Sequence, residues 1–209
     1  MLSLRPTYRA AHCATRTTIE IMPSHDTRTI NADRSDIEAL DEIWLFGYGS
    51  LIYKVDFPYA ESATAHITGW QRRFWQGSHD HRGTPEQPGR VLTLIEVPNA
   101  RCFGIAYRVT LDVFDHLDHR EKNGYLRSIQ TLYFGNGEFK QGVVYIGKPD
   151  NPAFLGEAPI EAIAQQISKS VGPSGPNTEY VHRLADALRQ QGEEDEHVFE
   201  IDRLLREMR

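Results

Sequence analysis

The sequence predicts an α+β fold, in which a strand-rich body is followed by helices toward the C-terminal end. Two observations lead to this prediction. Runs rich in Val, Ile, Tyr and Phe alternate with turn residues through the middle of the chain, and apolar residues recur at helical spacing near its end. Only one helical pattern interrupts the strands. The sheet is therefore expected to be mixed or antiparallel, able to curl into a barrel, and not doubly wound.

The first expected strand is the apolar, aromatic run from Ile43 to Tyr48. It stops at Gly49 and Ser50, which is typical of a buried strand that ends in a tight loop. Further strands are expected at residues 67–75, 91–97, 102–109, 129–134 and 143–147. Turn residues separate them, for example Pro98-Asn99, and the one interrupting helix is expected at 111–122.

Three apolar stripes at helical spacing predict three helices in the last third of the chain. The first runs from Ile160 to Val171, the second from Val181 to Leu188, and the third from Val198 to Leu205. Asn177 is placed to cap the second helix, and Gly192 is placed to end it.

The first 42 residues are expected to form a disordered leader and linker before a single domain at residues 43–209. Arg5, Arg9 and Arg16 precede the first acid, Glu20, which is a composition typical of an organelle transit peptide. A disordered tail, or a true start at Met22, explains the same composition. Residues 25–36 are polar without periodicity and are interpreted as linker.

Composition restricts the class of partner. The 209 residues carry a net charge of −6, which disfavours nucleic acid as a partner but permits a small anionic substrate in a locally positive pocket. No apolar run reaches the roughly 20 residues that span a bilayer, so no membrane partner is expected. The only two cysteines, Cys13 and Cys102, favour a reducing compartment. A monomer in the cytoplasm is expected, with organelle targeting by the leader as the alternative.

A candidate binding loop follows the first strand. It consists of Gly47, Tyr48, Gly49, Ser50, Leu51 and Ile52. Successive backbone N–H groups of such a loop can point at one anion. The alternative is a turn whose glycines only supply positive φ angles. A nucleophilic role for Ser50 is disfavoured, because a nucleophile elbow needs glycine two residues after the serine and Ile52 stands there.

A candidate catalytic carboxylate ends the expected helix. Val113, Leu117 and Glu121 are spaced four residues apart, so Glu121 continues an apolar stripe, and Asn123-Gly124 then ends the helix. A carboxylate that faces the core loses hydration, its pKa rises, and it becomes a competent base near neutral pH. The alternative is that Glu121 has turned toward the surface and pairs with Arg or Lys.

Two further segments allow weaker interpretations. His79, Asp80 and His81 could bind a metal, as could His116 and His119 near Glu121, but neither set has convincing ligand spacing, and no metal site is predicted. The loop 172–176 precedes a helix that carries Tyr180. That tyrosine is either a packing residue or part of a ligand site at the helix start.

Taken together, these segments resemble the ChaC family of glutathione-specific γ-glutamylcyclotransferases. The similar stretches are collinear and comprise residues 46–52, 54–59, 72–78, 80–83, 88–91, 104–108, 120–122, 172–175 and 177–180. The chain departs from the family pattern at Tyr53, where close relatives have Trp, at Asn123, where they have Gly, and at Pro176, where Arg or Lys is usual.

The resemblance implies a γ-glutamylcyclotransferase-like fold around a mixed β-barrel, with flanking and C-terminal helices. It implies that residues 47–52 hold the γ-glutamyl group of glutathione, that Glu121 is the base, and that Tyr180 lies by the pocket. The expected reaction converts glutathione to 5-oxoproline and cysteinylglycine without metal or organic cofactor. Arg72, Arg73 and Arg90 are possible partners for the glycine carboxylate. The alternatives are a broader γ-glutamyl-peptide or γ-glutamylamine cyclotransferase, or a non-catalytic γ-glutamyl-binding module.

Overall fold

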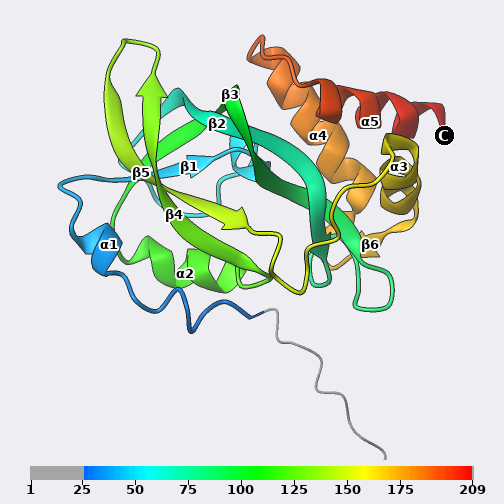
Figure 1. Cartoon of the computed structure of the whole chain (residues 1–209), viewed down its shortest axis with the longest axis horizontal. Coiled ribbons are helices and arrows are strands. Elements are labelled where there is room, and N and C mark those ends of the chain that lie inside the picture. Colours follow the sequence, from blue (N-terminus) through cyan, green and yellow to red (C-terminus); the bar gives the residue numbers. More distant parts are fainter. Residues whose placement is uncertain (1–25, 209) are drawn as a thin grey trace, which may run out of the picture.

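The computed structural model describes residues 26–208, which form a closed five-stranded barrel with helices around it (Figure 1). The strands are β1 (Ile43–Gly47), β2 (Glu61–Ser78), β3 (Gly89–Val109), β4 (Tyr125–Phe134) and β5 (Phe139–Gly147). Their order around the barrel is β1-β3-β2-β4-β5. All neighbours are antiparallel except β1 and β5, which pair in parallel at Leu45 and Val143 and close the barrel. The prediction of a mixed β-barrel is confirmed.

Strand β1 is apolar at successive positions because both of its faces are buried. Leu45 packs with Tyr107 and Val143 on one side, whereas Trp44 and Phe46 belong to the larger core on the other side. A strand with two buried faces loses the alternation of apolar and polar residues that marks a half-exposed strand.

Strands β2 and β3 are longer than the sequence predicted. The two strands expected at 91–97 and 102–109 are parts of β3, and Pro98-Asn99 does not end a strand. The pairing of β3 with β2 shifts register there, opposite Gly69, and Asn99 and Gly69 both adopt positive φ angles of 63° and 84°. The turn signal therefore produces an irregularity of the bulge type, which bends a long strand around the barrel.

One helix lies below the barrel in Figure 1 and brings its last turn toward the candidate site. It is α2, Val113–Arg120, and it buries Val113, Phe114 and Leu117 against the barrel. The helix ends before Glu121, and Gly124 follows with a positive φ of 88°. The helix therefore ends two residues earlier than predicted, and Asn123-Gly124 form the turn that follows it and not its cap.

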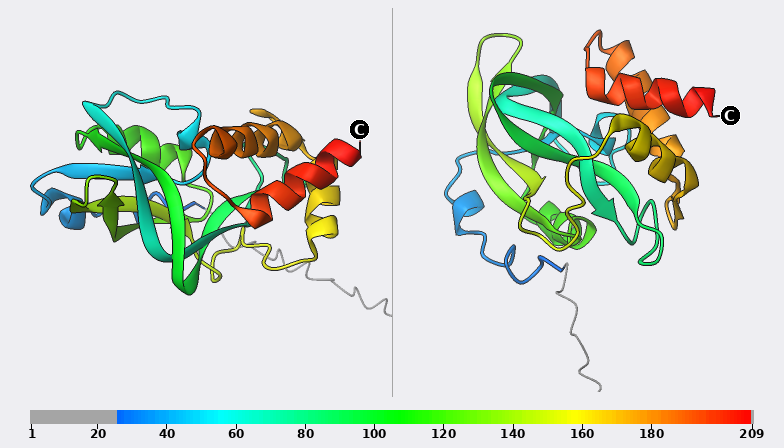
Figure 2. Two further views of the ribbon diagram at one scale, coloured as in Figure 1. Left: turned by 90° about the horizontal axis from the view of Figure 1, so that it is seen from above. Right: turned by 45° about the vertical axis from the view of Figure 1, so that its right-hand side comes forward.

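The C-terminal helices gather at one side of the barrel, as two further views show (Figure 2). They are α3 (Ile160–Lys169), α4 (Asn177–Gln190) and α5 (Glu196–Glu207). They agree with the three predicted stripes except at Val171, which lies beyond α3 and is exposed. A short hairpin of β6 (Val171–Gly172) and β7 (Gly175–Pro176) joins α3 to α4.

The two predicted helix ends of α4 differ in outcome. Gly192 has a φ of 70° and its N–H donates to the Arg189 carbonyl, so it ends α4 as predicted. The cap prediction for Asn177 is wrong, because this side chain bonds β3 and not the first turn of its own helix. Its Oδ1 accepts from the Arg90 N–H at 2.7 Å and its Nδ2 donates to the Arg90 carbonyl at 2.9 Å. Asn177 therefore fixes the start of α4 to the barrel.

Residues 26–42 differ from the expectation that they are linker. The short helix α1, Ser35–Glu38, places Ile37 in a fully buried position among the residues between α2 and the barrel. Thr27 donates its N–H to the Lys122 carbonyl at 2.9 Å, and Asn31 Nδ2 donates to the Tyr125 carbonyl at 3.0 Å.

Composition misled here because the segment is held by side-chain to backbone hydrogen bonds and by one apolar side chain, neither of which gives a periodic pattern. Arg34 adds an ion pair with Asp118 at 2.9 Å. The Arg-rich stretch of the predicted leader lies outside the described residues.

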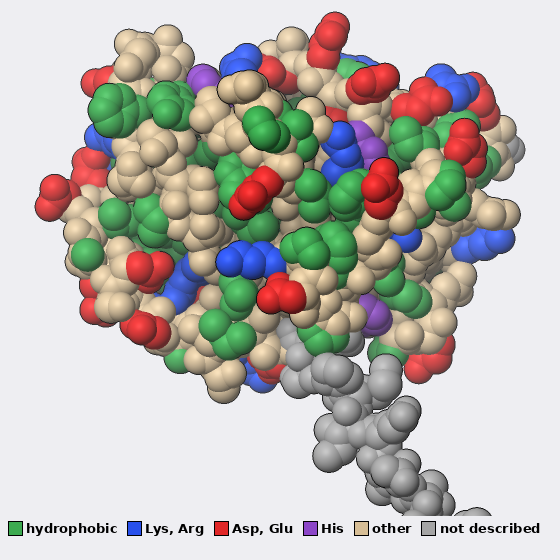
Figure 3. Space-filling model, viewed as in Figure 1, with side chains coloured by type: hydrophobic (Ala, Val, Ile, Leu, Met, Phe, Trp, Pro, Cys, Tyr) green, Lys and Arg blue, Asp and Glu red, His purple; other side chains and the backbone are tan. Residues whose placement is uncertain are grey.

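Charged side chains of both signs are interspersed on the face that Figure 3 shows. Charge is therefore distributed over this face, and the electrostatics of a site depend on its own lining. Within residues 26–208, no helix combines the length and the apolar character needed to cross a membrane.

Candidate active site

Glu121 and the candidate loop meet in one cavity. This inner cavity has a volume of about 70 Å³ and is lined by Leu45, Phe46, Gly47, Tyr48, Gly49, Ser50, Leu51, Leu92, Leu117, Arg120, Glu121, Tyr125, Tyr145 and Tyr180. An adjoining, wider cavity of about 310 Å³ shares Ser50, Arg120, Glu121, Tyr125 and Tyr180 with the inner cavity. We call the wider cavity the vestibule. The predicted site residues thus converge, with the exception of Ile52, which packs against the core and lines neither cavity.

Glu121 is the carboxylate at the boundary between the two cavities. Its N–H donates to the Leu117 carbonyl at 2.8 Å, which keeps it in line with the buried face of α2. Burial raises the pKa of Glu121 above its ordinary value, while the nearby charges of Arg120 and His81 oppose that rise. The carboxylate lines both cavities, as the first alternative required. It pairs with an arginine, but Arg120 lines the same cavities, so the surface orientation of the second alternative is not found.

Arg120 joins the carboxylate to the loop. Its Nε lies 3.2 Å from Glu121 Oε1, and its Nη2 donates to Ser50 Oγ at 2.8 Å. Its Nη1 donates to Asp56 Oδ1 at 2.7 Å. Ser50 Oγ is therefore a hydrogen-bond acceptor for a cation, and no base among the described residues is hydrogen-bonded to it.

The glycines of the loop provide space and not positive φ angles. Neither Gly47 nor Gly49 has a positive φ, so the proposed turn with left-handed glycines is wrong. A Cβ atom on Gly47 would lie 2.4 Å from Leu51 Cβ, and one on Gly49 would lie 2.8 Å from the Tyr180 hydroxyl. The absence of side chains at these positions lets the loop approach its own next turn and helix α4.

The loop is held from behind and leaves donors toward the cavity. The Tyr48 hydroxyl donates to the Tyr145 carbonyl at 2.8 Å, and the Tyr107 hydroxyl donates to the Leu51 carbonyl at 2.6 Å. The backbone N–H groups of Gly49, Ser50 and Leu51 find no hydrogen-bond acceptor among residues 26–208. Consecutive free N–H groups can bind an anion or a carbonyl oxygen.

Tyrosines form the remaining wall. Tyr180 on α4 is buried beside the loop, and Tyr125 donates to the Leu92 carbonyl at 2.5 Å. Tyr53 lines the vestibule, and its hydroxyl is buried without a hydrogen-bond partner among the described residues. Burial raises the pKa of Tyr53 to about 12, so this hydroxyl is a donor at neutral pH.

The arginines expected to meet a substrate carboxylate are not at this site. Arg90 lies away from both cavities and donates to the carbonyls of Phe74 and Gly156, each at 3.0 Å. Arg72 and Arg73 line a separate cavity. Strand alternation and burial decide these positions, and a sequence pattern does not give them.

Lysine and arginine line the vestibule in their place, at Lys54, Arg82 and Arg120, together with the histidines His81, His116 and His119. Arg82 is mostly buried there, and its Nη1 donates to the Pro176 carbonyl at 3.0 Å and lies 3.3 Å from Glu179 Oε2. The segment 80–83 carried a usable signal for this residue, because it is one of the stretches that resemble the family.

The histidines that suggested a metal have other neighbours. His116 Nε2 lies 3.4 Å from Asp56 Oδ2, and His81 Nδ1 lies 3.3 Å from Ser174 Oγ. Within residues 26–208, no three His, Cys, Asp or Glu side chains are grouped so that they could hold a metal ion.

Comparison with known proteins places the chain in a family. The family model described as "ChaC-like protein" matches residues 43–208. The chain belongs to this ChaC-like family.

Relatives with assigned names share most of the chain. Gamma-glutamylcyclotransferase 2-3 of Arabidopsis thaliana is 43% identical over 171 residues, covering 76% of this chain and 86% of the relative. Glutathione-specific gamma-glutamylcyclotransferase 1 of Homo sapiens is 40% identical over 166 residues, covering 75% of each chain.

A solved structure supports the assignment to the ChaC-like family. A yeast γ-glutamyl cyclotransferase specific to glutathione has a TM-score of 0.74 and 31% identity, and the match covers 80% of this chain and 97% of the yeast chain. The family resemblance and the barrel fold expected from the sequence are confirmed.

Proposed function

We propose that this protein is a glutathione-specific γ-glutamylcyclotransferase, which cleaves glutathione to 5-oxoproline and L-cysteinylglycine. The observation that carries the proposal is the meeting of the Glu121 carboxylate with the donor loop of Gly49, Ser50 and Leu51 in one cavity. The names of the ChaC-like relatives support the choice of glutathione as substrate.

The γ-glutamyl group is assigned to the inner cavity. Free N–H groups of the loop match the oxygens of its α-carboxylate or of its γ-carbonyl, and Tyr180 covers it from α4. The cysteinylglycine part then extends into the vestibule, where Arg82 and Lys54 provide positive charge for the terminal carboxylate. The vestibule volume of about 310 Å³ is in the range of small-molecule sites.

The reaction that this arrangement supports is an intramolecular acyl transfer. The α-amine of the γ-glutamyl group attacks its own γ-carbonyl carbon, a five-membered lactam closes, and the bond from that carbon to the cysteine nitrogen breaks. Glu121 accepts a proton from the amine and returns one to the leaving nitrogen, so protons balance and no water is consumed. Folding the substrate into the attacking shape supplies part of the rate, because nucleophile and carbonyl belong to one molecule.

The pKa of Glu121 suits this role. A base has to be unprotonated to accept the proton and basic enough to take it, and the raised pKa brings Glu121 closer to the working pH. Arg120 keeps the carboxylate ionised and aimed at the loop. The N–H groups of the loop stabilise the oxyanion that develops on the γ-carbonyl oxygen.

The test is the formation of 5-oxoproline by the purified full-length protein from glutathione and, separately, from γ-glutamyl-alanine. We expect kcat/KM for glutathione to be at least about 10-fold higher than for γ-glutamyl-alanine. One charge-assisted contact to the glycine carboxylate would give a difference of this size. Equal or reversed values would favour the broader γ-glutamyl-peptide cyclotransferase. Binding of glutathione without any 5-oxoproline would favour the non-catalytic module.

Location and assembly are part of the same proposal. A location in the cytoplasm agrees with the sparse use of cysteine, and a monomer is the proposed assembly. Imaging of the tagged full-length protein tests the location, and light scattering coupled to size exclusion tests the assembly. Import into an organelle would contradict the cytoplasmic location, and a stable dimer would contradict the monomeric assembly.

A further inference from the structure

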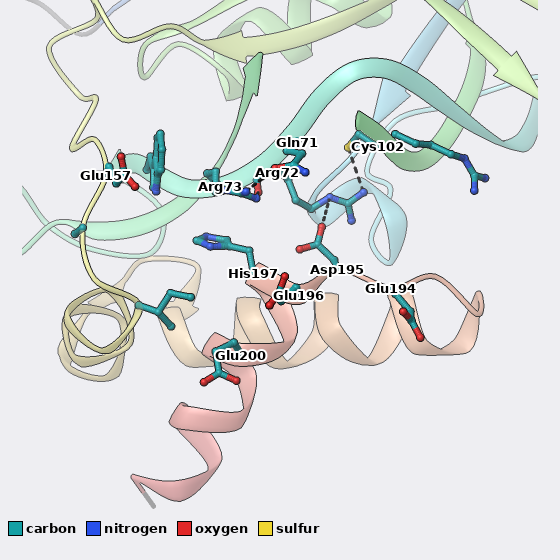
Figure 4. A pocket seen from close by; sticks show the side chains of 14 residues that line it. Gln71, Arg72, Arg73, Cys102, Glu157, Glu194, Asp195, Glu196, His197 and Glu200 are labelled. Atoms are coloured by element: carbon teal, nitrogen blue, oxygen red, sulfur yellow. Dashed lines mark hydrogen bonds and ion pairs between the residues drawn. The ribbon is translucent and has the colours of Figure 1, made fainter. Parts of the chain in front are cut away.

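A larger cavity lies between the barrel and helix α5 (Figure 4). Its volume is about 470 Å³, and none of its lining residues lines the inner cavity or the vestibule. Residues of β2 and β3 form one side, and residues 194–200 at the start of α5 form the other. We call it the second cavity. It contains Arg72 and Arg73, which the substrate site does not use.

The inner part of the second cavity presents hydrogen-bond donors. His197 is more than nine-tenths buried, and its Nε2 accepts the Phe74 N–H at 3.0 Å. Burial lowers the pKa of His197 to about 4, so the ring is neutral and its proton resides on Nδ1. That Nδ1–H has no acceptor among residues 26–208. In Figure 4 the His197 ring extends into the space beneath the strand that carries Arg73.

Two arginines add positive charge behind and beside this donor. Arg72 is almost fully buried, and its Nη1 has no hydrogen-bond partner in the described part of the chain. Its Nε lies 3.3 Å from Asp195 Oδ2, and its Nη2 donates to Cys102 Sγ at 3.3 Å. Arg73 donates to the Arg72 carbonyl at 2.8 Å, but no carboxylate among residues 26–208 pairs with it.

The rim of the cavity has the opposite character. Glu157, Glu194 and Glu196 are exposed, and none of them has an ion-pair partner within residues 26–208. A ligand that enters therefore passes these unpaired carboxylates and Arg101, which pairs with Glu193 at 3.5 Å, and meets the His197 donor and the Arg73 guanidinium at the inner end. A simple anion is disfavoured at the rim, and a simple cation is disfavoured at the inner end.

We propose that the second cavity is a binding site for a small zwitterion of the α-amino acid or short-peptide class. The ligand's carboxylate accepts from His197 Nδ1–H and from the Arg73 guanidinium, with the charge of Arg72 behind them. Its ammonium group lies among the rim carboxylates. The volume of about 470 Å³ admits a dipeptide. This site does not depend on the proposed cyclotransferase activity.

The test is isothermal titration of the full-length protein with three related probes. Glycylglycine is the zwitterion, N-acetyl-glycylglycine keeps only the negative charge, and glycylglycinamide keeps only the positive charge. We expect glycylglycine to bind at least about 10-fold more tightly than either of the others, because each lacks one of the two charge-assisted contacts. The absence of binding heat with glycylglycine at millimolar concentration would overturn the proposal. Equal binding of the three probes would also overturn it.

Two substitutions locate the binding. Arg73→Gln should weaken glycylglycine binding about 10-fold or more, whereas Arg82→Gln in the vestibule should leave it unchanged. The reverse pattern would place the probe in the vestibule and refute a second site. If Arg73→Gln does not fold, Glu157→Gln is the deciding variant. Removing this exposed carboxylate should reduce the preference for glycylglycine over N-acetyl-glycylglycine. An unchanged preference would then refute the proposal. Arg108→Gln on the barrel is the matched arginine control.

Discussion

The Nε atom of Arg120 lies 3.2 Å from Oε1 of Glu121, its neighbour in the sequence. The same guanidinium holds Ser50 at 2.8 Å. One cation therefore fixes both the proposed base and the loop that faces it. This contact determines the charge state of Glu121 as well as its position, and the first two predictions separate these effects.

Glu121→Gln should reduce kcat by about 10²–10⁴-fold, because glutamine has nearly the same volume but cannot accept the amine proton. The measurement is 5-oxoproline formation at saturating glutathione. Glu138→Gln, at an exposed position in the turn before β5, is the control and should be neutral. A folded Glu121→Gln enzyme with near-normal kcat would refute the assigned base.

Arg120→Gln should move the acid limb of the kcat/KM profile to higher pH. The charge of Arg120 lowers the pKa of Glu121, so its removal lets burial raise that pKa further, and the base is lost by protonation at a higher pH. Asp56→Asn should shift the limb in the opposite direction, since the Asp56 charge raises the same pKa. An acid limb that stays in place in both variants would show that it belongs to another group.

Gly49→Ala should lower kcat/KM, because the new Cβ would lie 2.8 Å from the Tyr180 hydroxyl. Combining it with Tyr180→Phe should cost less than the sum of the two single changes in ΔΔG‡, since the colliding oxygen is removed. Gly135→Ala is the control, because a Cβ there meets no atom within 4 Å. Additive effects would indicate that the loop and α4 do not press on each other.

His197 should make stability depend on pH below its ordinary pKa of about 6.5. Its pKa in the folded state is about 4, so between these values the unfolded chain binds a proton that the folded protein does not. Stability is therefore unaffected above pH 6.5 and falls as the pH drops toward 4, by up to about 3 kcal/mol. Urea unfolding of wild type and His197→Gln at pH 7 and 4.5 measures this; the variant should lose less stability, and exposed His119→Gln should behave as wild type. Parallel losses in all three proteins would contradict the buried neutral ring.

Ile37→Ala should destabilise the protein by about 2–5 kcal/mol, because the side chain is fully buried among the residues between α2 and the barrel. Ile30 is 64% exposed in the same segment, and Ile30→Ala should change stability little. Thermal or urea unfolding compares the two. Equal small effects would show that residues 26–42 do not contribute to the core.

Local patterns predicted the elements of the fold well, and tertiary contacts account for the misses. The stripe that ends at Glu121 identified a buried helix face because its period is a property of the chain alone. Pro98-Asn99 looked like a turn but lies within β3, because β2 pairs with the residues on both sides of it. Propensity yields to such pairing in a closed sheet.

Some residues of the candidate site could be predicted from the sequence, and others could not. The loop and the carboxylate could be inferred from the sequence, because each is a contiguous pattern next to an element end. The positions of Arg72, Arg73 and Arg90 could not, since whether a strand residue faces the site depends on the twist and register of long strands. Tyr53 reaches the vestibule from a segment without a chemical signal of its own, and the segment of Arg82 was marked only by its resemblance to the family.

Phe74 packs between Tyr180, which lines the vestibule, and His197, which lines the second cavity. Its ring centroid lies 5.8 Å from that of Tyr180 and 6.0 Å from that of His197, and the side chain is fully buried. Because Phe74 is closely packed, a ligand that shifts its ring from one side also changes the contacts of the ring on the other side. The consequence is reciprocity: whatever factor a zwitterion bound near His197 imposes on the affinity for a substrate near Tyr180, the substrate must impose on the zwitterion in return.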